Sequence, residues 1–265
     1  MSIASSRIAP ASADSLPSDP SADDDRLRQL AVLRAELDRV DDGLHDMLMH
    51  RAELVTQVGA LGAKGRVPLR PGREASILRR LLARNRGALA PAILVRIWRE
   101  MLAGSSAQQN PMVIVVGDPE LVVSVREHLG ALSRPETAGS SEAIERVRRG
   151  DAALAVLRMP SAEEQWWAEL RGDVHIVARL PYWSRPGAVE ALVLSAAAPD
   201  PSGQDRTVVA GVEPRVLSEA GFAGAALFAD GLAEVDGFVM QDDPRWRGMS
   251  ASVLGAYAVP VGDFV

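Results

Sequence analysis

A long run of regularly spaced apolar residues between Leu33 and Leu61 constrains this chain more than any other feature. The apolar positions recur at intervals of three and four residues, the period of an α-helix with one buried face. These positions are Leu33, Leu37, Val40, Leu44, Leu48, Leu54, Val55, Val58 and Leu61. We therefore predict one long helix over 33–61 whose apolar stripe is buried.

Arg34 and Arg51 lie within this amphipathic stretch. They are separated by seventeen positions, which corresponds to roughly 25 Å along a helix that rises about 1.5 Å per residue. The two arginines of one helix therefore cannot close on one small ligand. If both bind anions, each helix serves two pockets, and a symmetric dimer of antiparallel copies is the simplest arrangement. The alternative is a pair of surface arginines whose stems cover apolar side chains.

The composition narrows the possible function classes. A chain of 265 residues with 47% hydrophobic residues can bury the cores of one or two domains. Its net charge of −6 argues against nucleic acid as a main partner, because phosphate binding needs a basic surface. The sequence has no cysteine and its four histidines form no zinc motif, so no metal is expected. No apolar stretch of about 18 residues and no signal-peptide pattern is present, which favours the cytoplasm and no membrane contact.

Glycine and proline residues divide the rest of the N-terminal region. Residues 1–25 are rich in Ser, Ala, Pro and Asp, so we expect a disordered tail. The basic segment 62–73 is predicted to be a loop, because its glycines and prolines break a helix. A second helix is predicted from about Glu74, and a third from Pro91 to about Gln109.

Residues 111–265 alternate between strand and helix patterns. Strands are predicted in MVIVV, LAVLR, VHIVARLPYW, EALVLSAAA, TVVAGVEP, LFADGL and DGFVMQD, and helices in LVVSVREHLGAL and SSEAIERVRRG. The Gly-Asp pair after MVIVV lacks the spacing of a phosphate-binding loop, so we interpret it as a turn at a strand end. The sequence thus predicts a multi-domain chain, with an all-α three-helix domain over 26–110 and an α/β domain over 111–265.

Three segments carry a resemblance to a known family. Besides the Leu-Arg at 33–34, these are HRAELV (50–55), RPGREASILRRLLARNRGAL (70–89) and RIWREMLAGSSAQQ (96–109). Over residues 26–110 the chain resembles the all-helical chorismate mutases, including the mutase domain that precedes prephenate dehydratase in bifunctional proteins. The resemblance implies that chorismate is rearranged to prephenate in aromatic amino acid biosynthesis, with no cofactor, nucleophile or metal. It also implies an intertwined helical homodimer with two equivalent sites.

The resemblance assigns roles to the two arginines of the long helix. Arg34 matches the arginine that is contributed to the partner's site across the dimer. Arg51 matches the same-chain arginine that holds a substrate carboxylate. Two such arginines can pin the substrate in its compact conformer, which is catalysis by positioning.

The resemblance also extends to the second and third helices. Glu74 matches the carboxylate that contacts the substrate hydroxyl, with Arg73 as its basic neighbour. Ser105 and Gln109 match the serine and glutamine positions of the last helix, and four residues of separation place them on one face. The glutamine would face the ether oxygen of the substrate.

One position departs from the family pattern. The family has a lysine eleven residues after the position of Arg51, where it donates to the breaking ether oxygen, whereas this sequence has Gly62. The nearest lysine is Lys64, which on a continuing helix would point to nearly the opposite side. An early helix end at the glycines would let Lys64 turn inward and take over this role.

The C-terminal region carries weaker resemblances. SSEAIERVRRGDAALAVLRMP (140–160) is similar to a stretch of prephenate dehydratase, and LGAYAVP (254–260) resembles the end of an ACT-type regulatory domain. About 155 residues are too few for both complete domains, and the threonine-arginine-phenylalanine motif of the dehydratase cleft is absent. We therefore expect a shortened, dehydratase-derived domain without dehydratase activity, whose role is ligand sensing, dimer support or packing against the helices.

Three functions remain open at this point. The first is a working chorismate mutase. The second is isochorismate pyruvate lyase, which uses the same helical scaffold but is usually a short chain without an α/β extension. The third is a binding or regulatory protein that keeps the dimer and has lost turnover, for which Gly62 is the best argument.

Overall fold

The structure is a computed structural model that describes residues 20–61, 69–109, 112–184, 186–229 and 231–262. The helices are α1 (Pro20–Ala60), α2 (Pro71–Arg84), α3 (Pro91–Gln109), α4 (Leu121–Leu129), α5 (Ser140–Arg149), α6 (Pro214–Glu219) and the 3-10 turns η1 (Trp166–Glu169) and η2 (Pro244–Trp246). The strands are β1 (Ile114–Val116), β2 (Glu136–Thr137), β3 (Leu154–Arg158), β4 (His175–Leu180), β5 (Trp183–Ser184), β6 (Ala191–Ser195), β7 (Asp205–Ala210), β8 (Ala226–Ala229), β9 (Leu232–Asp236), β10 (Ser252–Ala258) and β11 (Val261–Gly262). The chain forms two compact units, one ending at Val55 and one beginning at Thr56.

Helix α1 confirms the long helix predicted from the apolar spacing, and it begins at Pro20. The acidic Asp23 lies in its first turn, where a negative charge favours the helix dipole. Residues 20–25 therefore belong to a helix, and the predicted tail is too long by these residues. Residues 1–19 lie outside the described part of the chain.

The apolar stripe of α1 is exposed in the single chain, contrary to the prediction that it is buried. Leu37 keeps 61% of its surface, and Leu44 keeps 55%. The same holds for Leu33, Val40, Leu48, Leu54, Val58 and Leu61, whereas Val55 is half-buried. Burial of this stripe therefore requires cover from outside α1.

Helices α2 and α3 begin where prolines fall in the sequence. Pro71 and Pro91 each open a helix, because the fixed φ of proline suits the first helical position. The predicted extent of α3 agrees with the structure, whereas α2 begins three residues before the start predicted near Glu74, so residues 71–73 are helical and not part of a loop. Residues 62–68 of the predicted loop lie outside the described residues. Both helices belong to the same compact unit as the sheet, so the boundary predicted near residue 110 falls inside that unit.

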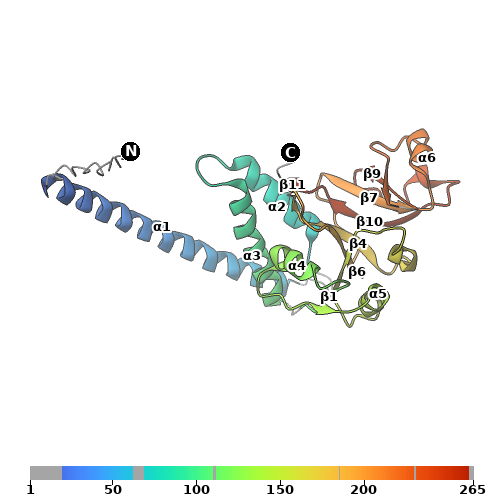
Figure 1. Cartoon of the computed structure of the whole chain (residues 1–265), viewed down its shortest axis with the longest axis horizontal. Helices are drawn as coiled ribbons and strands as arrows, with labels where there is room; N and C mark the ends of the chain where they lie inside the picture. The colour runs from blue at the N-terminus through green and yellow to red at the C-terminus, as the bar shows by residue number, and fades with distance from the viewer. Residues whose placement is uncertain (1–19, 62–68, 110–111, 185, 230, 263–265) are drawn as a thin grey trace, which may run out of the picture. The chain divides into compact units, whose positions relative to one another are not determined.

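One large sheet organises the second unit (Figure 1). Among the described residues nine strands pair in the order β2-β1-β3-β6-β4-β10-β7-β9-β8. In β3 all side chains but the last are buried, and they alternate between two cores. Leu154 and Val156 pack with α4, whereas Ala155 and Leu157 pack with α5. Because successive side chains of a strand point to opposite faces, α4 and α5 cover opposite faces of the sheet.

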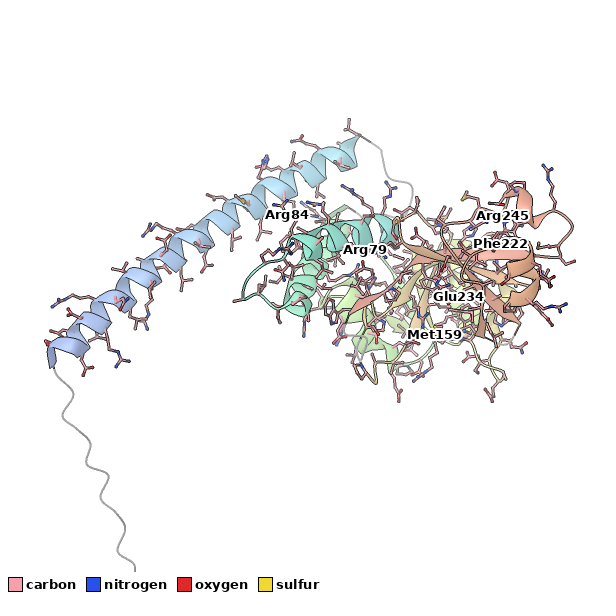
Figure 2. The ribbon with its side chains drawn as sticks, turned by 90° about the horizontal axis from the view of Figure 1, so that it is seen from above. Arg79, Arg84, Met159, Phe222, Glu234 and Arg245 are labelled. Atoms are coloured by element: carbon pink, nitrogen blue, oxygen red, sulfur yellow. The ribbon has the colours of Figure 1, made fainter. Side chains whose placement is uncertain are left out.

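The last four strands of this sheet form a recognisable motif. From β7 to β10 the order of elements is strand, helix α6, strand, strand, η2, strand. The neighbours β10-β7-β9-β8 are all antiparallel, which is the split βαβ arrangement of ferredoxin-like folds. Beside this motif the ring of Phe222 stacks on the ring of Trp246, with 4.1 Å between their centroids. The Cζ atom of Arg245 lies 4.2 Å from the centroid of the Phe222 ring (Figure 2).

Strand β10 joins the two halves of the sheet. It pairs with β7 on one side and runs parallel to β4 on the other, where Gly255 lies opposite Ile176. Gly255 has a φ of +144°, and a Cβ atom there would lie 2.1 Å from the Ile176 carbonyl oxygen. The LGAYAVP segment is therefore a central strand of the sheet, and its glycine permits the close approach of β4.

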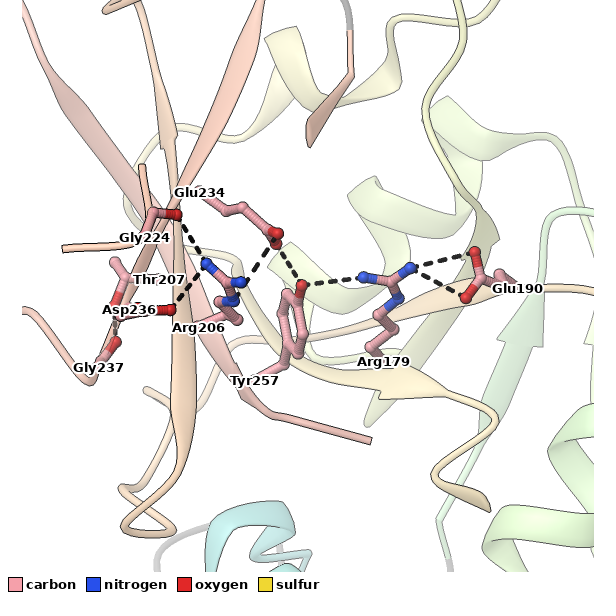
Figure 3. Close-up of polar contacts among 9 residues, drawn as sticks. All are labelled: Arg179, Glu190, Arg206, Thr207, Gly224, Glu234, Asp236, Gly237 and Tyr257. Atoms are coloured by element: carbon pink, nitrogen blue, oxygen red, sulfur yellow. Dashed lines mark hydrogen bonds and ion pairs between the residues drawn. The ribbon is translucent and has the colours of Figure 1, made fainter. Parts of the chain in front are cut away.

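A chain of polar contacts crosses this junction (Figure 3). Arg179 of β4 donates to Glu190 at 2.9 Å and to the Tyr257 hydroxyl at 3.1 Å. The Tyr257 hydroxyl donates in turn to Glu234, whose carboxylate also faces Arg206 at 3.8 Å. Tyr257 is buried, so these contacts satisfy polar atoms that water cannot reach.

The predicted strand DGFVMQD is wrong except for Asp236, the last residue of β9. Gly237 has a φ of +91°, which turns the backbone away from the sheet. The amide of Val239 donates to the Thr207 hydroxyl at 2.9 Å and not to a neighbouring strand. LFADGL spans the end of β8 and the first residue of β9, and the other strand and helix segments predicted after residue 111 are present.

Candidate active site

The two predicted arginines both lie on α1. Arg34 is exposed, and Arg51 is half-buried. They belong to the unit that ends at Val55, whereas the other predicted site residues belong to the unit that begins at Thr56. That Arg34 and Arg51 share a pocket with residues of α2 and α3 therefore remains a prediction.

The start of α2, which carries Arg73 and Glu74, is fixed by a carboxylate from a distant loop. Asp200 accepts hydrogen bonds from the backbone amides of Gly72 and Arg73, both at 3.0 Å. These amides have no partner within the helix, and a negative charge here also favours the helix dipole. A Cβ atom on Gly72 would lie 2.0 Å from the Asp200 carbonyl oxygen, so only glycine allows this approach. The Arg73 side chain itself is exposed.

Arg79 attaches the middle of α2 to the sheet. Its guanidinium donates to the Ser202 hydroxyl at 2.8 Å, to the Gln204 carbonyl at 2.9 Å and to the Val259 carbonyl at 2.8 Å (Figure 2). The last of these carbonyls directly follows β10. The helix that carries Glu74 is thus held by polar contacts at its first turn and about two turns later.

Glu74 forms a buried ion pair with an arginine that the sequence analysis did not single out. Arg99 of α3 donates from Nη1 to Glu74 Oε2 at 2.8 Å, and the two residues are 4% and 7% exposed. The Arg99 guanidinium lies over the Tyr182 ring at 4.7 Å, and the Tyr182 hydroxyl donates to the Ala75 carbonyl at 3.2 Å. The carboxylate predicted to contact substrate is therefore held in a fixed position between α2 and α3.

Burial dominates the electrostatics of this pair. It lowers the pKa of Arg99, and the nearby Glu74 carboxylate opposes that shift. An arginine remains protonated in proteins even so, so the two buried charges compensate each other. Removing either one would break a pair of buried charges, which is strongly destabilising in a medium of low dielectric.

The sequence does contain a signal for Arg99. It falls in phase with Val95, Leu102 and Ser106, all on the buried face of α3. A charged residue on a buried helix face needs a partner, and this reasoning would have marked Arg99 as a structural or functional residue. The identity of the partner depends on tertiary packing and could not be read from α3 alone.

The remaining predicted residues lie near the end of α3 or outside the described chain. Ser105 is half-buried, and its hydroxyl donates to the Met101 carbonyl at 2.7 Å within the same helix. Gln109 is the last residue of α3, in helical register with Ser105. Gly62 and Lys64 lie outside the described residues.

The described residues offer no obvious place for a metal or a membrane span. No group of three or more His, Asp or Glu side chains among them could hold a metal ion. None of the helices in this part of the chain combines the length and apolar character needed to cross a membrane.

Comparison with known proteins identifies the helical region. Residues 33–110 match the family model of chorismate mutase type II. This range includes Arg34 and Arg51 of α1 and the whole of α2 and α3. The resemblance inferred from the sequence motifs is therefore confirmed for this part of the chain.

Curated relatives are bifunctional chorismate mutase/prephenate dehydratases. The protein of Stutzerimonas stutzeri is 26% identical over 147 residues, covering 51% of this chain and 40% of the relative. The protein of Pseudomonas aeruginosa is 28% identical over 134 residues, covering 48% of this chain and 37% of the relative. The protein of Neisseria gonorrhoeae is 31% identical over 87 residues, covering 33% of this chain and 24% of the relative. The chain thus spans less than half the length of these relatives.

Solved structures give only distant likenesses. Prephenate dehydratase from Streptococcus mutans is 15% identical, with a TM-score of 0.36, covering 56% of this chain and 98% of the other. A protein described as GqqA, a quorum quenching acylase, is 17% identical with a TM-score of 0.39, covering 55% and 94%. Scores of this size do not establish a shared fold.

Proposed function

We propose that this chain is a chorismate mutase that rearranges chorismate to prephenate. The observation that carries the proposal is the match of residues 33–110 to the type II mutase family, in a stretch that contains Arg34 and Arg51 on one helix. The relatives are named for the same activity. Rearrangement of a single substrate needs no cofactor, so the protein contributes only shape and charge.

We further propose that the active species is a homodimer in which a second copy covers the exposed stripe of α1. Burying each of its leucines and valines contributes about 1.5–3 kcal/mol, which is a strong drive for association. The roughly 25 Å between Arg34 and Arg51 supports this arrangement, because each arginine then serves a different pocket. Arg34 enters the partner's site, and Arg51 acts in its own chain.

Within each site we assign the residues to substrate groups by their charge. Arg51 and the partner's Arg34 hold the two substrate carboxylates, with Arg73 as a further cation. Glu74 accepts from the substrate hydroxyl, and its ion pair with Arg99 supports this role by fixing the carboxylate.

The proposed donors at the ether oxygen come from elsewhere in the chain. Gln109 faces this oxygen, Ser105 lies one turn before it on α3 and contacts substrate, and Lys64 supplies the cation that the family places at Gly62. Charge grows on the ether oxygen as its bond lengthens, so these donors stabilise the transition state more than the substrate.

The first test is the loss of chorismate absorbance at micromolar enzyme, with prephenate measured as product. Wild type should turn over, and Arg51→Ala should lose about 10²–10³ in rate, the usual effect of removing a preorganised donor. Arg39→Ala is the matched control, because Arg39 is an exposed arginine of α1 whose contacts to Glu36 and to the Ala35 carbonyl lie within its own helix. Pyruvate release from isochorismate would identify a lyase instead. Binding of a transition-state analogue without turnover would identify a binding protein.

A separate variant tests the proposed substitute for the missing lysine. Lys64→Ala should reduce turnover by about 10²–10³ while chorismate binding changes less, because the donor acts mainly in the transition state. Unchanged turnover would remove Lys64 from the mechanism and leave the rest of the proposal standing.

We also propose that residues 111–265 carry no prephenate dehydratase activity. The support is the absence of the threonine-arginine-phenylalanine motif, in whose place stands EALVLSA. Residues Ala191–Ser195 of this segment form a strand that is buried along its whole length. Incubation with prephenate should give no loss of substrate above the uncatalysed rate.

A further inference from the structure

A cavity of about 330 Å³ lies between α3, α4 and the segment 181–183. Its walls are the N-terminal half of α3, one face of α4 and the aromatic residues Tyr182 and Trp183. Arg96 of the cavity and Ser105 of the proposed active site are nine positions apart on α3, which corresponds to roughly 13 Å along the helix. The cavity therefore lies apart from the end of α3, and it adjoins the proposed substrate site through Arg99, which contacts Glu74.

One buried donor of this cavity lacks a partner among the described residues. Arg99 is 4% exposed, and its Nε has no hydrogen-bond partner in that part of the chain. His128 of α4 is 7% exposed and lines the same cavity. Buried donors are nearly always satisfied in folded proteins. The position of the Arg99 Nε at a cavity wall indicates that a bound molecule satisfies it.

The charge of the cavity wall favours an anion. Arg96 and Arg99 are three residues apart and so lie on one side of α3. Glu127 is the one acidic residue of the wall. His128 adds no charge at neutral pH, because burial, and to a lesser degree Arg99, hold its pKa well below the usual value. Two cations therefore face one carboxylate.

The remainder of the wall is apolar and suits a compact body. Val95 is buried, and Tyr182 and Trp183 present ring surfaces. The volume lies at the lower end of the range for small-molecule sites, which are typically apolar with a few placed polar groups. This combination accommodates a single ring better than an extended chain.

We propose that this cavity binds a small carboxylate with an apolar, ring-sized body. The carboxylate pairs with Arg96 and with the Nε–H of Arg99, His128 provides a further hydrogen bond, and the ring lies against Val95, Tyr182 and Trp183. The same guanidinium donates from Nη1 to Glu74. Arg99 therefore connects the occupant of the cavity to the carboxylate that the mutase proposal places in the active site.

Isothermal titration with benzoate tests the site, and benzamide serves as the neutral molecule of the same shape. The full-length protein should bind benzoate saturably and at least about tenfold more tightly than benzamide, since hydrogen bonds between charged groups are the stronger kind. Equal affinity for the two probes, or no binding of either, would overturn the proposal. Chorismate is absent from the titration, so the result does not depend on whether the chain is a mutase.

Three variants locate the binding. Arg96→Ala should weaken benzoate binding about tenfold or more and leave benzamide unchanged, and the exposure of Arg96 makes a folding defect unexpected. Arg126→Ala is the control, because Arg126 is an exposed arginine of α4 that does not line the cavity. Equal losses in both variants would contradict the assignment.

Glu74→Gln tests the shared guanidinium. This change removes the charge that compensates Arg99 and keeps an oxygen that can accept its hydrogen bond, so benzoate should bind more tightly than to wild type. Unchanged or weaker binding of benzoate by a folded Glu74→Gln protein would show that the benzoate carboxylate does not reach Arg99.

Discussion

The Nη1 atom of Arg99 lies 2.8 Å from Oε2 of Glu74, and both side chains are almost fully buried. Taking two charges out of water is costly, and their attraction compensates only when the geometry is good. The pair connects the first turn of α2 with the middle of α3. It places a carboxylate that was predicted from the sequence next to an arginine that was not.

Removing one member of this pair should destabilise the protein strongly. Arg99→Leu removes the guanidinium that pairs with the buried Glu74 carboxylate, for which we expect a loss of about 3–5 kcal/mol in the free energy of unfolding. The double variant Arg99→Leu/Glu74→Leu should recover part of this loss. Urea denaturation at one protein concentration measures both. Additive effects of the two substitutions would contradict a direct interaction.

The cap of α2 should contribute measurably to stability. Asp200→Ala removes the acceptor of the Gly72 and Arg73 amides, and we expect a loss of about 1–2 kcal/mol. Hydrogen exchange at these two amides should accelerate more than elsewhere in α2. Asp173→Ala is the control, because its ion pair with Arg148 is partly exposed and should contribute about 0–1 kcal/mol.

Stability should depend on the protonation of His128. Burial lowers the pKa of His128 in the folded state, so the unfolded state binds the proton more readily. The stabilisation is therefore complete above the unfolded pKa near 6.5. As the pH falls below that value it declines, with a slope that approaches about 1.4 kcal/mol per pH unit.

Comparison of His128→Leu with wild type isolates this effect from other titrating groups. Thermal unfolding between pH 7.5 and 5 should show a shallower decline for the variant. Half-buried His175 also has a lowered pKa because of burial, and its contribution is common to both proteins. Identical pH profiles would mean that His128 titrates normally in the folded protein.

The polar chain across the sheet junction predicts unequal effects for two tyrosines. Tyr257→Phe removes contacts to Arg179 and Glu234, both charged, and should cost about 1.5–3 kcal/mol. Tyr182→Phe removes one hydrogen bond to a backbone carbonyl and should cost about 0.5–1.5 kcal/mol. Chemical denaturation compares them. A larger loss for Tyr182→Phe would argue against the junction role of Tyr257.

Much of the secondary structure could be predicted because its signals are local. Pro91 marks the start of α3, and the three-and-four spacing of leucines marks α1. Pro71 was assigned to a loop although it opens α2, because proline breaks a helix interior but suits its first position. The start of α1 at Pro20 was missed because its first residues are polar and carry no apolar period. The strand predicted after Asp236 failed because Val239 is buried by packing while its amide bonds to the Thr207 hydroxyl.

The order of the strands and the contacts of the site depend on residues far apart in the chain. Asp200 caps a helix 128 residues earlier, and no local pattern links the two. Arg99 carried a local signal in its buried helical phase, but its partner lies 25 residues away. The arginines of α1 were found from their spacing, and their assembly with α2 and α3 stays a prediction.

The central claim, a mutase whose sites are shared between two copies, is tested most directly by mixing two inactive variants. Arg34→Ala and Arg51→Ala should each consume chorismate far more slowly than wild type. When the two are refolded together in equal amounts, half of the dimers are mixed, and each mixed dimer holds one intact site. The mixture should then recover about a quarter of the wild-type rate. No recovery on mixing, with both variants folded and dimeric, would contradict the shared site.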